Sequence, residues 1–356
     1  MTLCVHNSPI DNTAAASDSG TKRARLVSLD AFRGLAVLIM LLVNNLGTGP
    51  DIPVQLKHAG WNESVHVADM AFPWFLFCSG IAIPFSAASW RRNGLSRRDV
   101  WMKIARRLVI LILLGSLVDS CEDRHLVTFS IGILQTIALS YLVAVSLRRL
   151  SGIWRGIVAA LLLVAYWAAI RFAPIPGMGE FRENNNLILY LNKTFLSDLG
   201  LWGLTRIVPT SALVLIGTCV GDFLMAGGYP KFRKVFVLVF SGTAVAALGY
   251  LWNIDLQFNK WVWTSSYVLL TAGLGMILLG GFFLAADTYD LKKWVQPLVI
   301  FGSNAILAYV LPIVVKSLVL TSLHIYMGGW RSVTVFVAVW WLVFLWLFHR
   351  RIFLKA

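Results

Sequence analysis

The chain has 356 residues, of which 58% are hydrophobic and 13% are charged, and its mean hydropathy is +0.73. A water-soluble domain could not cover that much apolar side chain with polar surface, so lipid must solvate most of it. The formal net charge is +14, but the basic residues lie in short clusters between apolar runs. The composition therefore indicates an integral membrane protein and argues against a nucleic-acid partner.

The start of the chain differs in composition from the rest. Residues 1–24 are polar, rich in Ser, Ala, Asp and Thr, and lack the apolar stretch of a signal peptide. We expect them to form a disordered cytoplasmic tail before a transmembrane domain that spans residues 25–356. The four cysteines show neither CxxC spacing nor a dense pairing pattern, so we predict no disulfide framework and no metal site.

Ten apolar runs are of the length that a membrane-spanning helix requires. A hydrocarbon core of about 30 Å needs roughly 20 residues in helical conformation. The runs fall near 31–47, 67–89, 104–119, 130–147, 153–172, 204–226, 234–252, 264–286, 295–318 and 332–348. The sequence thus predicts an all-α, polytopic integral membrane protein with about ten transmembrane helices.

Lysine and arginine concentrate in alternate loops between these runs. The basic clusters lie at 22–25, 91–107, 148–155, 231–234, 292–293 and 350–355. Because positively charged loops stay in the cytoplasm, we expect an even number of spans and both termini in the cytoplasm. We expect the membrane to be the inner (plasma) membrane. Ser96 and Asp99 predict a capping box that starts an amphipathic stretch at 97–107.

The densest unusual feature lies between the first two apolar runs. Asn44 and Asn45 end the first run, His58 lies in the following loop, and Asp69 begins the second run. Polar side chains are costly in lipid unless they face a partner or a cavity, so we expect them to point inward. A carboxylate can set the tautomer of a histidine base, and an amide can stabilise an oxyanion. These residues are therefore candidates for a catalytic site.

A structural interpretation of the same residues stays open from spacing alone. His58 would then be a loop histidine at the interface, the two asparagines a polar helix end, and Asp69 the cap of the second helix. The outer tryptophans fit an aromatic belt, with sugar stacking as the alternative. Asp30 and Arg33, three residues apart at the other mouth of the first run, fit either an ion pair or a ligand contact.

Seven segments between residues 25 and 309 form a combination that is more specific than any one of them. They are 25–34 (RLVSLDAFRG), 43–45 (VNN), 58–62 (HAGWN), 67–75 (VADMAFPWF), 132–135 (GILQ), 263–273 (WTSSYVLLTAG) and 301–309 (FGSNAILAY). Together they resemble the heparan-α-glucosaminide N-acetyltransferase family.

The resemblance implies an acyltransferase that moves an acetyl group from cytosolic acetyl-CoA to the amine of a terminal glucosamine across the membrane. It implies His58 as the catalytic base, with Asn44 or Asn45 and Asp69 as its polar partners. CoA is a long anion, so its nucleotide should stay near the basic cytoplasmic mouth. The residues expected to contact it are Asp30, Arg33, Trp74 and Asn304.

Two other functions fit the residues. A histidine base serves a hydroxyl as well as an amine, so the enzyme could be an O-acetyltransferase of a surface polysaccharide. A protein of a different class, a carrier for a sugar or amino sugar without chemistry, would also line its pathway with polar residues. The lipid bilayer is a partner in every case, and the resemblance is compatible with a homodimer.

Overall fold

The structure is a computed structural model that describes residues 26–123, 130–172, 181–324 and 328–354. Within these ranges all longer elements are helices, and the one isolated bridge joins Arg182 to Asn185. The expected all-α fold is therefore confirmed. The predicted tail at 1–24 lies outside the described residues.

The helices follow the predicted apolar runs in chain order. Their bounds are α1 Val27–Leu46, α2 Val67–Arg92, α3 Arg97–Asp123, α4 Ile133–Ser146, α5 Gly152–Phe172, α6 Leu187–Leu191, α7 Ile207–Met225, α8 Lys231–Trp252, α9 Ser265–Phe282, α10 Lys292–Ser303, α11 Ala305–Val315 and α12 Gly329–His349. Short turns of other helix types include the 3-10 turn η1 (Val54–Leu56) and the π-helical turn η5 (Lys316–Leu320).

The number of helices that could cross a membrane is smaller than predicted. In the described part of the chain seven are long and apolar enough, and the pair α10 and α11, bent by 64°, raises the number to eight. The predicted count of about ten is not confirmed. α4 has only 14 residues, and α3, although 27 residues long, carries charged residues at both of its ends.

A capping box of two hydrogen bonds marks the start of α3. The predicted capping box is confirmed, since Asp99 Oδ2 accepts from the Ser96 N–H at 3.2 Å and Ser96 Oγ accepts from the Asp99 N–H at 3.2 Å. The arginine-rich first turns of α3 follow directly.

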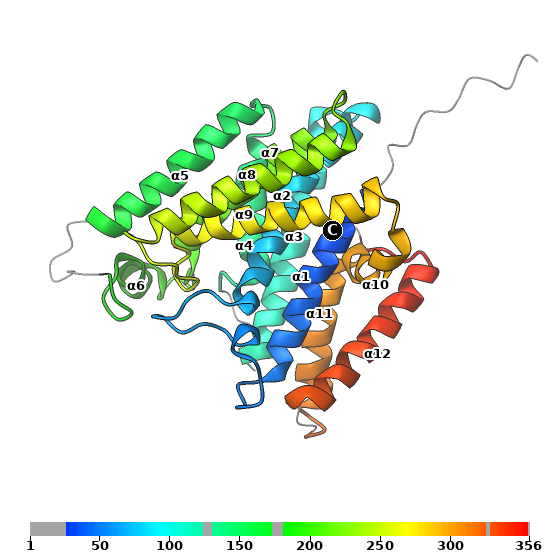
Figure 1. The fold of residues 1–356 in the computed structure, drawn as a ribbon. Coiled ribbons are helices and arrows are strands. Elements are labelled where there is room, and N and C mark those ends of the chain that lie inside the picture. The colour runs from blue at the N-terminus through cyan, green and yellow to red at the C-terminus, as the bar shows by residue number, and fades with distance from the viewer. Residues whose placement is uncertain (1–25, 124–129, 173–180, 325–327, 355–356) are drawn as a thin grey trace, which may run out of the picture.

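The helices divide into an inner and an outer group (Figure 1). α1, α2, α7 and α9 are largely buried, whereas α5, α8 and α12 are largely exposed and carry large apolar side chains on their outer faces. In the figure α5 (green) and α12 (red) lie at opposite edges, with α1 (blue) between them. Apolar outer helices around a packed interior suit a protein that lipid surrounds.

α1 approaches α10 so closely that side chains would not fit between them. A Cβ atom at Gly302 would lie 1.8 Å from the carbonyl oxygen of Asp30, and one at Gly34 would lie 1.8 Å from that of Leu298. Small residues at a membrane helix interface allow this backbone approach. The contact fixes α1, whose far end carries Asn44 and Asn45, against the first half of the bent pair.

Candidate active site

Asp69 joins the loop after α1 to the start of α2. It lies in the first turn of α2, and His58 lies on the loop just after η1. Asp69 Oδ2 accepts hydrogen bonds from the backbone N–H groups of Ala59 at 3.2 Å and His66 at 3.1 Å. A carboxylate is favoured at a helix N-terminus, where backbone N–H groups lack partners. Asp69 is thus the third residue of a capping box whose N-cap is His66, and the same carboxylate also binds the backbone of Ala59, next to His58.

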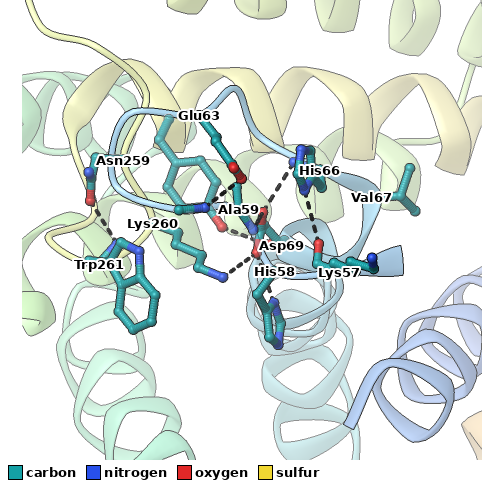
Figure 2. A network of polar contacts seen from close by, with 12 residues as sticks. Lys57, His58, Ala59, Glu63, His66, Val67, Asp69, Asn259, Lys260 and Trp261 are labelled. Atoms are coloured by element: carbon teal, nitrogen blue, oxygen red, sulfur yellow. Dashed lines mark hydrogen bonds and ion pairs between the residues drawn. The ribbon is translucent and has the colours of Figure 1, made fainter. Parts of the chain in front are cut away.

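The second carboxylate oxygen of Asp69 contacts two side chains, which form with it the His58 cluster (His58, Asp69 and Lys260; Figure 2). His58 Nδ1 lies 2.9 Å from Asp69 Oδ1, and Lys260 Nζ donates to the same oxygen at 2.6 Å. The Asp69 side chain is fully buried, whereas that of His58 is 52% exposed. Because an ionised carboxylate only accepts, Nδ1 carries a proton, and in the neutral ring Nε2 is then the acceptor. This arrangement suits a general base that a substrate can reach.

Lys260 is the member of the cluster that sequence reasoning missed. It lies between α8 and α9, 191 residues after Asp69. Its neighbour Asn259 anchors the loop, because Nδ2 donates to the Trp61 carbonyl at 3.2 Å and Oδ1 accepts from the Val262 N–H at 3.2 Å. Burial lowers the pKa of the Lys260 ammonium from its usual value, although the hydrogen bond and charge of Asp69 oppose the shift. One feature of the sequence could have indicated Lys260. It is a lysine in a loop on the side opposite the basic clusters, where positive residues are scarce.

α9 supports the first turns of α2. The hydroxyl of Tyr267 donates to the backbone carbonyl of Asp69 at 2.5 Å, and Trp74 Nε1 donates to the Thr271 carbonyl at 3.2 Å. Trp74 is buried, and its ring packs 5.8 Å from that of Phe32 on α1. The expected contact of Trp74 with acetyl-CoA stays a prediction.

Asn44 and Asn45 line a cavity of about 320 Å³ at the end of α1, which we call the Asn45 cavity. Asn45 is buried and its Nδ2 donates to the Leu41 carbonyl at 2.8 Å, whereas Asn44 is exposed. Across the described ranges, no hydrogen bond joins either asparagine to His58 or Asp69. The two asparagines therefore line a cavity. Their role in stabilising the oxyanion of the reaction stays a prediction.

The residues expected near the cytoplasmic mouth have partners within the protein. Arg33 Nη1 lies 3.6 Å from Asp30 Oδ1, so the ion pair exists. Asn304 occupies the break between α10 and α11, where its Nδ2 donates to the Ile352 carbonyl at 2.8 Å and its Oδ1 accepts from the Leu354 N–H at 2.9 Å. Contacts of these three residues with acetyl-CoA stay predictions.

A second cavity, of about 350 Å³, lies at the other end of α2. Four arginines line it, namely Arg91, Arg97, Arg148 and Arg149. Burial and the like charges of its neighbours lower the pKa of Arg148. At about 1.5 Å of rise per residue, Arg91 lies roughly 33 Å along the helix from Asp69. The two ends of α2 thus present a carboxylate site and a basic site about one membrane thickness apart. In the described ranges no three His, Cys, Asp or Glu side chains gather as a metal ion would require.

Known proteins are similar in sequence to this chain over much of its length. A family model described as "Heparan-alpha-glucosaminide N-acetyltransferase, catalytic" matches residues 25–252. The heparan-alpha-glucosaminide N-acetyltransferases of Homo sapiens and Mus musculus are 25% and 24% identical to the chain, over 80% of it and over 52% and 53% of their own lengths. The chain therefore spans about half the length of the curated relatives it matches. As its motifs predicted, this chain belongs to the family of the heparan-alpha-glucosaminide N-acetyltransferase catalytic region.

Proposed function

We propose that the chain is a transmembrane acetyltransferase. It moves the acetyl group of cytosolic acetyl-CoA to the amine of a glucosamine-type sugar at the opposite membrane face. The observation that carries the proposal is the 2.9 Å contact between a half-exposed His58 and a fully buried Asp69. Membership of an N-acetyltransferase family and the seven apolar helices support it.

In the proposed reaction the amine nitrogen forms a bond to the acetyl carbonyl carbon while the carbon–sulfur bond of the thioester breaks. His58 Nε2 takes the proton that the nitrogen loses and returns it to the sulfur, so that CoA leaves as a thiol. Asp69 accepts from Nδ1 and stabilises the imidazolium that forms in between. An amide of Asn44 or Asn45 donates to the carbonyl oxygen as that atom gains negative charge.

The arrangement of charge supports the proposed orientation. The arginine-lined cavity marks one end of α2 as the basic end, which the positive-inside rule assigns to the cytoplasm. The two described chain ends lie near each other, because Leu354 bonds to Asn304 and the neighbouring Gly302 packs against Asp30 in the first turn of α1. We therefore propose an inner-membrane protein with cytoplasmic termini, an acyltransferase domain over residues 25–356, and a CoA nucleotide that approaches from the arginine side.

Acetyl transfer from labelled acetyl-CoA to glucosamine by the purified full chain tests the proposal. We expect His58→Ala to lower the turnover number by at least about 10²-fold, since general-base catalysis contributes roughly that much or more. His349→Ala, which changes an exposed histidine at the end of α12, is the matched control and should keep full activity. Full turnover in a His58→Ala variant with an unchanged melting temperature would overturn the catalytic assignment.

The same assay separates the two alternatives. N-acetylglucosamine offers hydroxyls but no free amine, so an O-acetyltransferase would label it and the proposed enzyme would not. The break between α10 and α11 is a feature that carriers also use, because discontinuous helices bind substrates at mid-membrane. A carrier would move labelled glucosamine into proteoliposomes without acetylating it.

A further inference from the structure

The Asn45 cavity contains a lysine that projects from an apolar membrane segment. Lys316 begins the π-helical turn η5, which continues α11 beyond the bend at Asn304. A charged side chain inside such a segment is costly and usually marks a ligand pathway. π-helical turns and broken helices are likewise frequent at binding sites. A charged residue and a π-helical turn thus meet at one wall of this cavity.

Lys316 has a structural contact that accounts for only part of its polar capacity. Its Nζ donates to the backbone carbonyl of Asn44 at 3.2 Å, and this carbonyl is one of those that the last turn of α1 leaves without a helical partner. An ammonium has three hydrogens, so up to two others can serve a ligand. Capping of α1 therefore explains the position of Lys316 without using all of its donors.

Asn45, in contrast to Lys316, has an acceptor atom that lacks a donor in the described part of the chain. Its Oδ1 atom is buried and has no hydrogen-bond partner among the described residues, while one of the two hydrogens on its Nδ2 goes to the Leu41 carbonyl. A buried carbonyl oxygen of this kind is destabilising until a hydroxyl or an amine donates to it. Since Asn45 lines the cavity, a ligand there can supply that donor.

We propose that the Asn45 cavity binds the acceptor sugar, a neutral or amine-bearing ring rather than an anion; this assignment rests on the proposed function. Met40 and Ile313 give the cavity an apolar wall for a ring face, while Asn45, Lys316 and Glu122 give it a polar wall for hydroxyls and an amine. Its volume of about 320 Å³ lies within the range of small-molecule sites.

Charge and position favour the acceptor over CoA. In the Asn45 cavity one lysine is balanced by one glutamate, whereas a phosphate-rich ligand calls for several cations, as the arginine-lined cavity offers. The cavity also lies where α1 gives way to the loop that carries His58, at the end of the bundle away from the arginines.

Steady-state kinetics with glucosamine and acetyl-CoA test the assignment. We expect Lys316→Met to raise KM for glucosamine at least tenfold and to leave KM for acetyl-CoA within twofold. Lys316→Gln keeps a donor for the Asn44 carbonyl, so it serves if the methionine variant does not fold, and it should raise the same KM. Lys293→Met, an exposed lysine on α10, is the control and should change neither constant.

Glucosamine binding to a variant that cannot turn over separates the assignment of the Asn45 cavity from the assignment of His58 as the base. Full-length His58→Ala protein should bind glucosamine as wild type does, and adding Lys316→Gln should weaken that binding at least tenfold. Unchanged glucosamine binding, or a rise in KM for acetyl-CoA instead, would overturn the acceptor cavity even if wild-type acetyl transfer is observed. Conversely, turnover by His58→Ala would remove the proposed mechanism and leave this binding result standing.

Discussion

The His58 cluster and the Asn45 cavity lie at the same end of the molecule and treat their polar atoms in opposite ways. Asp69 accepts from four donors, two backbone N–H groups and the side chains of His58 and Lys260. The Asn45 cavity leaves a buried carbonyl oxygen without a partner among the described residues and places a lysine beside open space. On the proposed assignments, the protein satisfies the polar atoms of the carboxylate that orients the base, and it leaves available those of the residues that bind the acceptor.

This difference has a physical basis. A catalytic base works best when its orientation is set before the substrate arrives, and a network with every member satisfied is rigid. A binding site needs donors and acceptors that are still available, because a ligand group must replace the water it loses. The two regions can be tested separately by substitutions that disturb one and leave the other intact.

Asp69→Asn is expected to have the largest effect. The amide keeps an oxygen that can cap α2, but it removes the charge that stabilises the imidazolium and can turn the ring to the wrong tautomer. We expect the turnover number to fall by about 10²–10⁴-fold. KM for glucosamine should change less than threefold, because Asp69 does not line the Asn45 cavity. A tenfold rise in that KM would show that the two regions are one site.

Lys260→Met should change the pH dependence more than the maximal rate. Without the ammonium, the imidazolium that forms on His58 during transfer faces the full charge of Asp69. We expect the acid limb of the kcat/KM profile to move upward by as much as about one pH unit. Because burial lowers the pKa of Lys260, wild type loses this cation at lower pH than a surface lysine would, and the two profiles should converge at alkaline pH.

Lys57→Met provides the control for this shift, since Lys57 precedes His58 in the chain and makes no side-chain bond to Asp69 within the described ranges. An unshifted profile in Lys260→Met, with a lowered melting temperature alone, would reduce Lys260 to a structural ion-pair partner.

Local pattern explains which parts of this structure could be predicted. Each of the ten apolar runs coincides with helix, because apolar composition over such lengths specifies helix in lipid. The number of spans was not predictable in the same way, since the short α4 and the charged ends of α3 depend on how neighbouring helices bury them. The break at Asn304 likewise has no proline at that position to announce it.

The site shows the same limit. His58 and Asp69 are 11 residues apart, so a loop could bring them together, and a family motif pointed to both. Lys260 is 191 residues from Asp69, and only packing of the loop before α9 against α2 creates the contact. The partnerless oxygen of Asn45 is also a property of packing, because the same asparagine pair could equally have ended a helix in solvent.

Gly302→Ala should disturb the Asn45 cavity by displacing α1. An added Cβ would meet the Asp30 carbonyl, so we expect a loss of stability of about 1–3 kcal/mol, as overpacking typically causes. Gly281→Ala, where no atom lies within 4 Å, is the matched control and should be neutral or slightly stabilising. Melting temperatures in detergent measure both effects. A higher KM for glucosamine in Gly302→Ala, with an unchanged pH profile of kcat/KM, would show that the substitution changes the Asn45 cavity and not the His58 cluster.

Asn304→Ala should have the smallest effect. It tests whether a polar side chain whose atoms are all hydrogen-bonded within the protein only holds the backbone in place. Both polar atoms of Asn304 bond the chain end, at Ile352 and Leu354, in the way that both oxygens of Asp69 are occupied. The sequence placed Asn304 among the acetyl-CoA contacts, whereas its two bonds favour an anchoring role. We therefore expect a loss of about 1–2 kcal/mol in stability and a KM for acetyl-CoA within twofold of wild type. A rise in that KM of tenfold or more would mean that Asn304 releases Ile352 and Leu354 and contacts acetyl-CoA when the latter binds. Full hydrogen bonding in the ligand-free protein would then no longer distinguish residues that position the chain from residues that bind a ligand.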